Sequence, residues 1–142
     1  MSKAVELLLL TGQSEIQQLH DKLEALALET GIPQEHLHKV QLAAEEYLTN
    51  VFKYAFDQQG SPHVKVRLQL ENGELCLEFE DEGRPFNLLE HPAPDLTVPL
   101  DQRPVGGLGI HMIRQSMDRV EYRRSGDKNI VVMAKRIKTA TP

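Results

Sequence analysis

One pair of side chains in this sequence combines a possible proton acceptor with a possible metal ligand. Glu46 and Asn50 stand four residues apart in a stretch with helical periodicity, so their side chains emerge one turn apart, opposite the apolar stripe. A carboxamide oxygen suits Mg²⁺, and a carboxylate one turn earlier can orient or deprotonate a hydroxyl or a water. Glu45 lies about 100° away from the side of the helical wheel that carries Asn50, which favours Glu46 as the base. The alternative is that the pair belongs only to the polar outer face of an amphipathic helix.

A second group of residues follows the end of a predicted strand. Asp81 can accept a hydrogen bond from an exocyclic amine, and Gly83 lets the backbone approach a flat ring closely. An ordinary strand-ending turn would use the same residue types, because Asp and Gly favour turns. The segment therefore indicates either a site for a heterocyclic base or a simple turn.

A third group is the glycine-rich segment Gly106-Gly107-Leu108-Gly109, directly before a predicted helix. Glycines at a helix N-terminus expose backbone N–H groups to an anion and permit close approach of a phosphate. A flexible hinge would explain the glycines equally well. The segment is neither a P-loop, which requires Gly-Lys-Ser/Thr, nor a dinucleotide fingerprint, which requires a preceding strand in a βαβ unit.

The elements that must position these residues follow from hydrophobic periodicity. The order is strand, helix, helix, strand, strand, long loop, helix, strand and strand, over residues 4–10, 14–31, 33–56, 64–70, 75–79, 81–106, 110–117, 120–122 and 130–137. This order predicts an α+β fold of two layers, a mostly antiparallel mixed sheet with its helices packed on one face. At 142 residues, the chain fits one domain over residues 1–142.

Local signals set several of these boundaries. Ser14 is a predicted helix N-cap, Pro33 suits the first turn of the second helix, and Asn72-Gly73 predicts a hairpin turn. Residues 82–105 are rich in proline and lack periodicity, so we expect a mobile lid over the site.

Composition argues against several classes of function. The formal net charge of −5 disfavours a nucleic-acid surface, which needs clustered positive charge. No apolar run approaches the roughly 18 residues of a membrane span, and the N-terminus lacks the pattern of a secretory signal. A single cysteine, Cys76, cannot form an intramolecular disulfide, which suits a reducing cytoplasm. We therefore expect a cytoplasmic protein that binds neither nucleic acid nor a membrane directly.

The order and context of the three groups resemble the GHKL (Bergerat-fold) ATPase and kinase superfamily, in its anti-sigma-factor serine kinase branch. The resemblance runs through nearly the whole chain. Its motifs are Glu46-Tyr47-Leu48-Thr49-Asn50, Asp81-Glu82-Gly83-Arg84-Pro85-Phe86 and Gly107-Leu108-Gly109-Ile110, continued by Ile113-Arg114-Gln115-Ser116-Met117-Asp118 and Met133-Ala134-Lys135-Arg136. The resemblance implies a Bergerat-type sandwich that binds ATP and Mg²⁺ as a single HATPase-like domain.

By that resemblance, the residues of the three groups have defined roles. Members of the branch often place Thr or Ser near the adenine after the last turn, where this chain has Asp127-Lys128-Asn129, so Asn129 is a possible substitute. The implied roles are catalytic base for Glu46, Mg²⁺ ligand for Asn50, adenine contact for Asp81, a place beside the adenine for Gly83, and phosphate contacts for Gly106, Gly107, Leu108 and Gly109.

The same resemblance implies a cytoplasmic anti-sigma factor with ATP-dependent protein-serine/threonine kinase activity toward an anti-anti-sigma protein of the STAS type. The implied partners are that protein, a sigma factor and a second copy of the chain in a homodimer. An alternative is a nucleotide-gated protein-binding module with negligible phosphoryl transfer. A third interpretation, a detached catalytic domain of a histidine-kinase-like system, is disfavoured because no adjoining helix pair carries a phospho-acceptor histidine.

Overall fold

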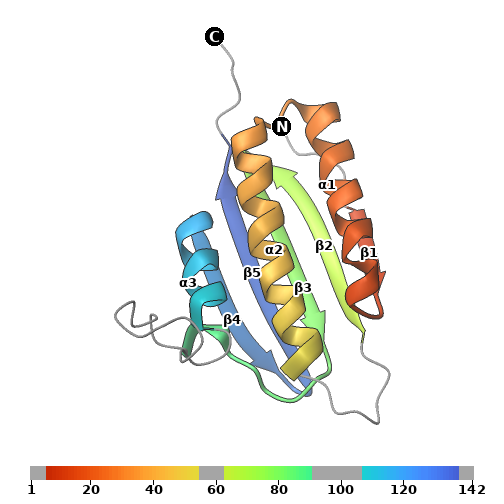
Figure 1. The fold of residues 1–142 in the computed structure, drawn as a ribbon, viewed down its shortest axis with the longest axis vertical. Coiled ribbons are helices and arrows are strands. Elements are labelled where there is room, and N and C mark those ends of the chain that lie inside the picture. Colours follow the sequence, from red (N-terminus) through yellow and green to blue (C-terminus); the bar gives the residue numbers. More distant parts are fainter. Residues whose placement is uncertain (1–5, 55–62, 91–106, 138–142) are drawn as a thin grey trace.

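A five-stranded sheet forms one layer of the fold, and the α-helices form the other (Figure 1). The computed structural model describes residues 6–54, 63–90 and 107–137. Two short 3₁₀ turns, Gln13–Glu15 and Leu88–Glu90, accompany the longer elements. Those elements are β1 (Glu6–Leu10), α1 (Ile16–Thr30), α2 (Gln34–Tyr54), β2 (Val64–Glu71), β3 (Glu74–Asp81), α3 (Gly107–Ser116), β4 (Arg119–Ser125) and β5 (Lys128–Arg136). The predicted α+β fold class is confirmed.

The strands follow the order β1-β2-β3-β5-β4, and each described pairing is antiparallel, so no parallel pair of a mixed sheet occurs among them. The predicted hairpin turn joins β2 to β3. Asn72 and Gly73 both have positive φ, 52° and 77°, as a two-residue turn matching the twist of the strands requires. Because β5 lies between β3 and β4, Asp81 at the end of β3 pairs directly with Asn129 near the start of β5.

The core lies between the sheet and the helices. Alternate side chains of β2 and β3 are buried, including Val66, Leu77 and Phe79, and they meet the apolar stripes of α1 and α2. Helices α1, α2 and α3 lie over the same face of the sheet (Figure 1), as the sequence predicted. None of the helices in the described ranges is long and apolar enough to cross a membrane.

The start of α1 differs from the prediction. Ser14 is not an N-cap; it lies inside the 3₁₀ turn Gln13–Glu15, and Glu15 precedes α1 without a side-chain capping bond. The Glu15 carboxylate instead accepts the backbone N–H of Thr11 at 2.6 Å, and the helix begins at Ile16, one residue later than predicted. The predicted end is confirmed, because Gly31 adopts the left-handed conformation with φ 79°.

The start of the predicted lid, residues 82–90, contacts the rest of the fold, while its mobility stays a prediction. The backbone N–H of Phe86 donates to Asn129 Oδ1 at 3.3 Å, and the side chain of Leu88 is fully buried in the core. Proline content and missing periodicity concealed these anchors, because they come from a strand more than forty residues away in the sequence. The remainder of the predicted lid lies outside the described residues.

Candidate functional site

The carboxylate of Asp81 is held on one side and left open on the other. Oδ1 accepts the backbone N–H of Gly83 at 2.8 Å and the amide of Asn129 at 3.0 Å. Oδ2 is buried and has no hydrogen-bond partner among the described residues. A buried acceptor without a donor is costly, and native structures keep such atoms rarely. Oδ2 is therefore the atom of this site that most needs a ligand's N–H group.

Burial and the neighbouring groups shift the pKa of Asp81 in opposite directions. Burial is the largest influence and raises the pKa of the carboxyl above its ordinary value. The hydrogen bonds from Asn129 and Gly83, and the charges of Arg124 and His63, act in the opposite direction and favour the carboxylate. The net pKa remains raised, so holding this acid in place costs the protein stability when the group is ionised.

Asn129 is the centre of the hydrogen bonds around Asp81. Its side chain is only 1% exposed. The amide nitrogen reaches Asp81 Oδ1 and the carbonyls of Gly83 and Arg84, at 3.0, 3.4 and 2.8 Å. Its Oδ1 accepts the hydroxyl of Tyr122 at 2.6 Å. This residue links β3, β4, β5 and the segment after Asp81.

The candidate pair on α2 lies in a more enclosed place than the wheel suggested. Asn50 is 8% exposed, so it does not belong to an outer solvent face, whereas Glu46 is half-buried. The reason is that α3 packs beside α2, which a single-helix wheel cannot show. The Asn50 amide nitrogen donates to the Glu46 carbonyl at 2.8 Å. Its Oδ1 accepts no hydrogen bond from the described residues and is free to bind a cation.

Glu45 is engaged elsewhere. Its carboxylate lies 3.1 Å from Nε2 of His20 on α1, on the other flank of α2. The carboxylate of Glu46 forms no ion pair or hydrogen bond with any residue in the described ranges. The two adjacent acids therefore face different surroundings, as the wheel predicted.

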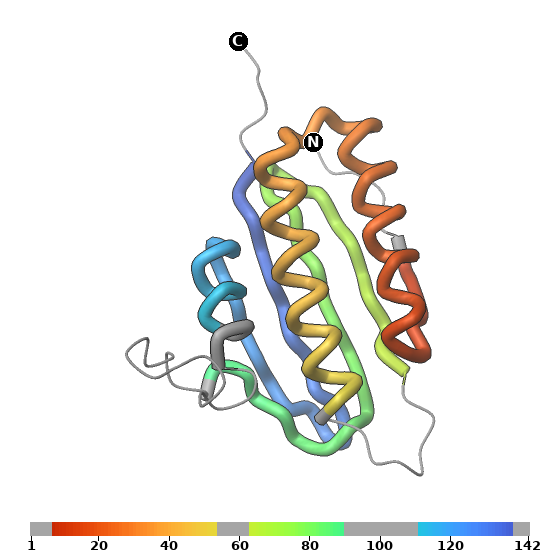
Figure 2. Tube along the Cα trace, viewed as in Figure 1, coloured from red at the N-terminus to blue at the C-terminus, as the bar shows by residue number. Residues whose placement is uncertain are grey.

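The glycine-rich segment begins α3 rather than preceding it. Gly107, Leu108 and Gly109 form the first turn of the helix, and Gly106 lies outside the described residues. The first N–H groups of a helix have no partner within it, so the turn retains the capacity to bind an anion. Figure 2 shows the ends of α2 and β3 and the start of β5 at one end of the molecule, and Figure 1 shows α3 beginning toward the same end. The fold thus brings the three groups to the same end.

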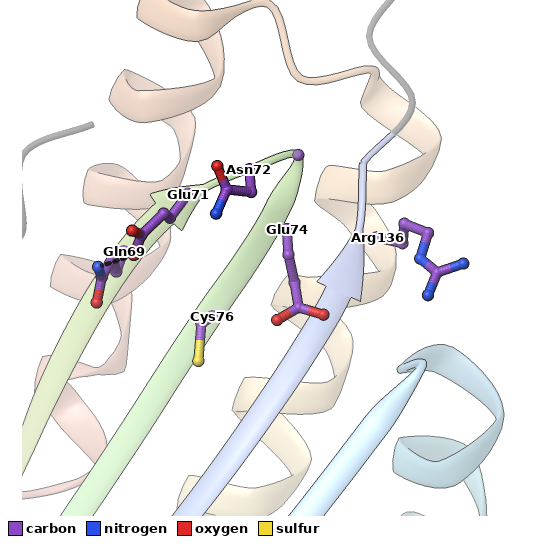
Figure 3. A pocket seen from close by; sticks show the side chains of 7 residues that line it. Gln69, Glu71, Asn72, Glu74, Cys76 and Arg136 are labelled. Atoms are coloured by element: carbon purple, nitrogen blue, oxygen red, sulfur yellow. Dashed lines mark hydrogen bonds between the residues drawn. The ribbon is translucent and has the colours of Figure 1, made fainter. Parts of the chain in front are cut away.

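A separate hollow of about 440 Å³ lies at the other end of β3, around the β2–β3 hairpin (Figure 3). It opens on the sheet face opposite the helices and contains none of the predicted site residues. Two glutamates line it, which disfavours a phosphate-bearing ligand. Its lining residues are Gln69, Glu71, Asn72, Gly73, Glu74, Cys76 and Arg136.

Comparison with known proteins identifies the family. The pattern of the family described as histidine kinase-like ATPase domain matches residues 12–135. The chain belongs to this family. This histidine kinase-like ATPase domain is 28% identical over 83 residues to the serine/threonine-protein kinase BtrW of Bordetella bronchiseptica, which covers 58% of each chain. It is 26% identical over 114 residues to the serine-protein kinase RsbW of Halalkalibacterium halodurans, covering 78% of this chain and 68% of the relative.

Solved structures of related domains share the fold. The histidine kinase domain of a blue-light-activated kinase from Erythrobacter litoralis has a TM-score of 0.55 at 22% identity, covering 88% of this ATPase domain and 60% of that chain. A structure of RsbU and RsbW domains from Mycobacterium tuberculosis has a TM-score of 0.63 at 12% identity, covering 96% and 35%. At these identities the likeness shows the fold alone. The serine-protein kinase relatives support the predicted branch of the superfamily.

Sequence reasoning missed two polar residues of this ATPase domain. Tyr122 and Arg124 alternate on β4, and both point toward the site, where Arg124 donates to the carbonyl of Gly83 at 2.8 Å. The signal was present, because Tyr122 shares the inward alternation of Val120. Their contacts become visible only once β4 is placed beside β5.

Proposed function

We propose that this domain binds ATP with Asp81 as the acceptor for the adenine amine. The observation that carries the proposal is the buried, unpartnered Oδ2 of Asp81. Adenine presents an N–H donor where guanine presents a carbonyl oxygen, so a fixed acceptor would select ATP over GTP. The buried position of Gly83, two residues after Asp81, supports the same assignment.

The phosphates and Mg²⁺ would lie between α2 and α3. The free carboxamide oxygen of Asn50 is a suitable ligand for Mg²⁺, which keeps several waters and phosphate oxygens in its coordination sphere and needs few protein ligands. The first turn of α3, with Gly107 and Gly109, offers unpaired N–H groups to the phosphates. Mg²⁺ would neutralise charge on the triphosphate during transfer.

We further infer that the domain is a protein-serine/threonine kinase of the anti-sigma type. The named activity of its serine-protein kinase relatives and the position of Glu46 support this proposal. Glu46 would accept the proton of a partner's hydroxyl as the hydroxyl oxygen attacks the γ-phosphorus and the bond to ADP breaks. The hydroxyl would belong to an anti-anti-sigma protein of the STAS type. The domain would act as a homodimer, and a sigma factor would be its other binding partner.

Asp81→Asn tests the adenine site. The substitution keeps an acceptor for Asn129 and Gly83 but places an N–H₂ group opposite the adenine amine. We expect ATP affinity in calorimetry to fall by about 100-fold, as for a buried hydrogen bond replaced by an unpaired donor, and the preference over GTP to narrow. Glu82→Gln is the matched control, because that neighbouring carboxylate is exposed. Equal affinity of Asp81→Asn and wild type would refute the assignment.

Glu46→Gln separates catalysis from binding. The amide keeps the shape of the side chain but cannot take the proton, so transfer of labelled phosphate to the partner protein should fall by about 10²–10⁴-fold, with ATP affinity unchanged. Asn50→Ala should weaken Mg·ATP binding and transfer together. Glu45→Gln is the control and should transfer normally. A wild-type domain that binds ATP but phosphorylates no partner would favour the nucleotide-gated module instead.

A further inference from the structure

The hydrogen-bonding capacity of Asn129 is fully used within the protein. A carboxamide has two N–H donors and one oxygen with two lone pairs. The donors are shared among Asp81 Oδ1 and the carbonyls of Gly83 and Arg84. The two lone pairs take the Tyr122 hydroxyl and the Phe86 N–H. No group remains for a base, which disfavours Asn129 as a direct substitute for the family's Thr or Ser.

These five bonds fix the parts of the site that would meet the base. With Oδ1 of Asp81 occupied by two donors, the carboxylate cannot rotate without losing both bonds, and Oδ2 stays in one place. The bonds to Gly83, Arg84 and Phe86 also hold the following segment beside the strand. A carboxamide whose hydrogen bonds are all made in this way makes its surroundings rigid, and Oδ2 of Asp81 is the acceptor left for a ligand.

We propose that Asn129 is a positioning residue for base recognition, which fixes Asp81 and the segment after it for an exocyclic amine without touching the nucleotide. This inference rests on the proposed ATP site. Tyr122 takes part in the same arrangement, because its hydroxyl donates to Asn129 Oδ1 at 2.6 Å and helps to hold the carboxamide in place. Strand β4, which lies on the other side of β5 from β3, thereby contributes to the preference for ATP over GTP.

Asn129→Asp is the direct test, because it keeps shape and size but turns the donating nitrogen into an oxygen. That oxygen would face three acceptors, one of them a carboxylate. We expect ATP affinity in calorimetry to fall by at least about tenfold and the preference for ATP over GTP to approach one. The transfer rate at saturating ATP should be unchanged. Asn87→Asp is the matched control: its oxygen caps the Leu89 N–H, which aspartate also does, so its ATP affinity should equal that of wild type.

A purine riboside triphosphate separates positioning from general damage. This nucleotide lacks the 6-amino group, so wild type and Asn129→Asp should bind it with similar affinity. Equal weakening of both nucleotides would show a merely structural role and would overturn the proposal. Retention of wild-type affinity and preference by Asn129→Asp would overturn it as well.

Tyr122→Phe keeps the test decisive if Asn129→Asp fails to fold. It removes one hydroxyl and leaves the ring, so we expect a smaller loss of ATP affinity, about threefold to tenfold, again without loss of the saturated rate. Unchanged affinity would contradict the role of Tyr122. Failure of the proposed function has a different signature, because wild type would then bind neither ATP nor the analogue.

Discussion

The apolar core and the polar end of this domain differ in whether their buried atoms lack hydrogen-bond partners. We define the apolar core as Leu19, Leu23, Leu48, Leu68 and Leu77, and the polar end as Tyr47, Asp81, Tyr122 and Asn129. The apolar core contains no polar atom that needs a partner. At the polar end, the Tyr47 hydroxyl and Asp81 Oδ2 are buried without one. Unmet hydrogen-bonding capacity therefore marks the candidate site of this fold.

Two other buried atoms lack partners in the described part of the chain, and they sharpen the contrast. Both are imidazole nitrogens, Nδ1 of His20 and of His36. A neutral imidazole can leave one nitrogen as an unprotonated acceptor, which costs less than an isolated carboxylate oxygen. Within the described ranges, a phenol and a carboxylate share this lack of a hydrogen-bond partner only at the polar end.

The largest effect on stability is expected from the apolar core. Leu23→Ala removes buried volume from α1, so the free energy of unfolding should fall by about 2–5 kcal/mol in urea denaturation. ATP affinity should be unchanged in conditions where the variant is fully folded. A matched loss of affinity in a folded variant would break the division between the two regions.

Asp81→Asn should affect stability in the opposite direction. Burial raises the pKa of Asp81 above its ordinary 3.8, so the native state holds this proton at pH values where the unfolded state has lost it. Wild-type stability should therefore decline as pH rises through that window. The stability that protonated Asp81 provides stays lost at neutral pH. Asp81→Asn should flatten this decline and unfold at higher urea concentration at pH 7, measured without nucleotide. A variant less stable than wild type at pH 7 would contradict the pKa direction.

The smallest effect is expected at Tyr47, whose ring packs on Phe79 with centroids 5.0 Å apart. Burial, and then the charge of Asp81, raise the pKa of Tyr47, so its hydroxyl is protonated and uncompensated. Tyr47→Phe should keep the ring contact and raise the free energy of unfolding by up to about 1 kcal/mol. A loss of stability of similar size, measured in thermal melts, would mean that the Tyr47 hydroxyl has a hydrogen-bond partner. The polar end would then have one unpartnered atom fewer.

The sequence predicted elements better than contacts. Alternation in β2 and β3 and the Asn72-Gly73 turn specify a local hairpin, because both depend on neighbouring residues. The position of Asp81 at the end of this strand pattern gave the candidate acceptor. The anchoring of residues 82–90 was not predictable in this way, since it depends on the non-local partner Asn129.

The glycine motif and Asn50 show the same limit. The start of α3 was placed after the glycines because glycine disfavours helix interiors, yet the first turn tolerates Gly107 and Gly109 where few hydrogen bonds are formed. The wheel placed Asn50 opposite the apolar stripe and could not show that it is buried, because a wheel considers one helix at a time.

The position of β5 between β3 and β4 has a consequence for the order of folding. Asp81 and Asn129 are 48 residues apart in sequence, and the strand that carries Asn129 is the last of the described sheet to be synthesised. Strands separated by this many residues pair slowly, because the long intervening segment must first lose conformational entropy. A nascent chain would complete the β2–β3 hairpin early and yet hold Asp81 unclamped until β5 enters the sheet. The recognition site would thus mature as one of the final events of folding, after most of the core beneath it has formed.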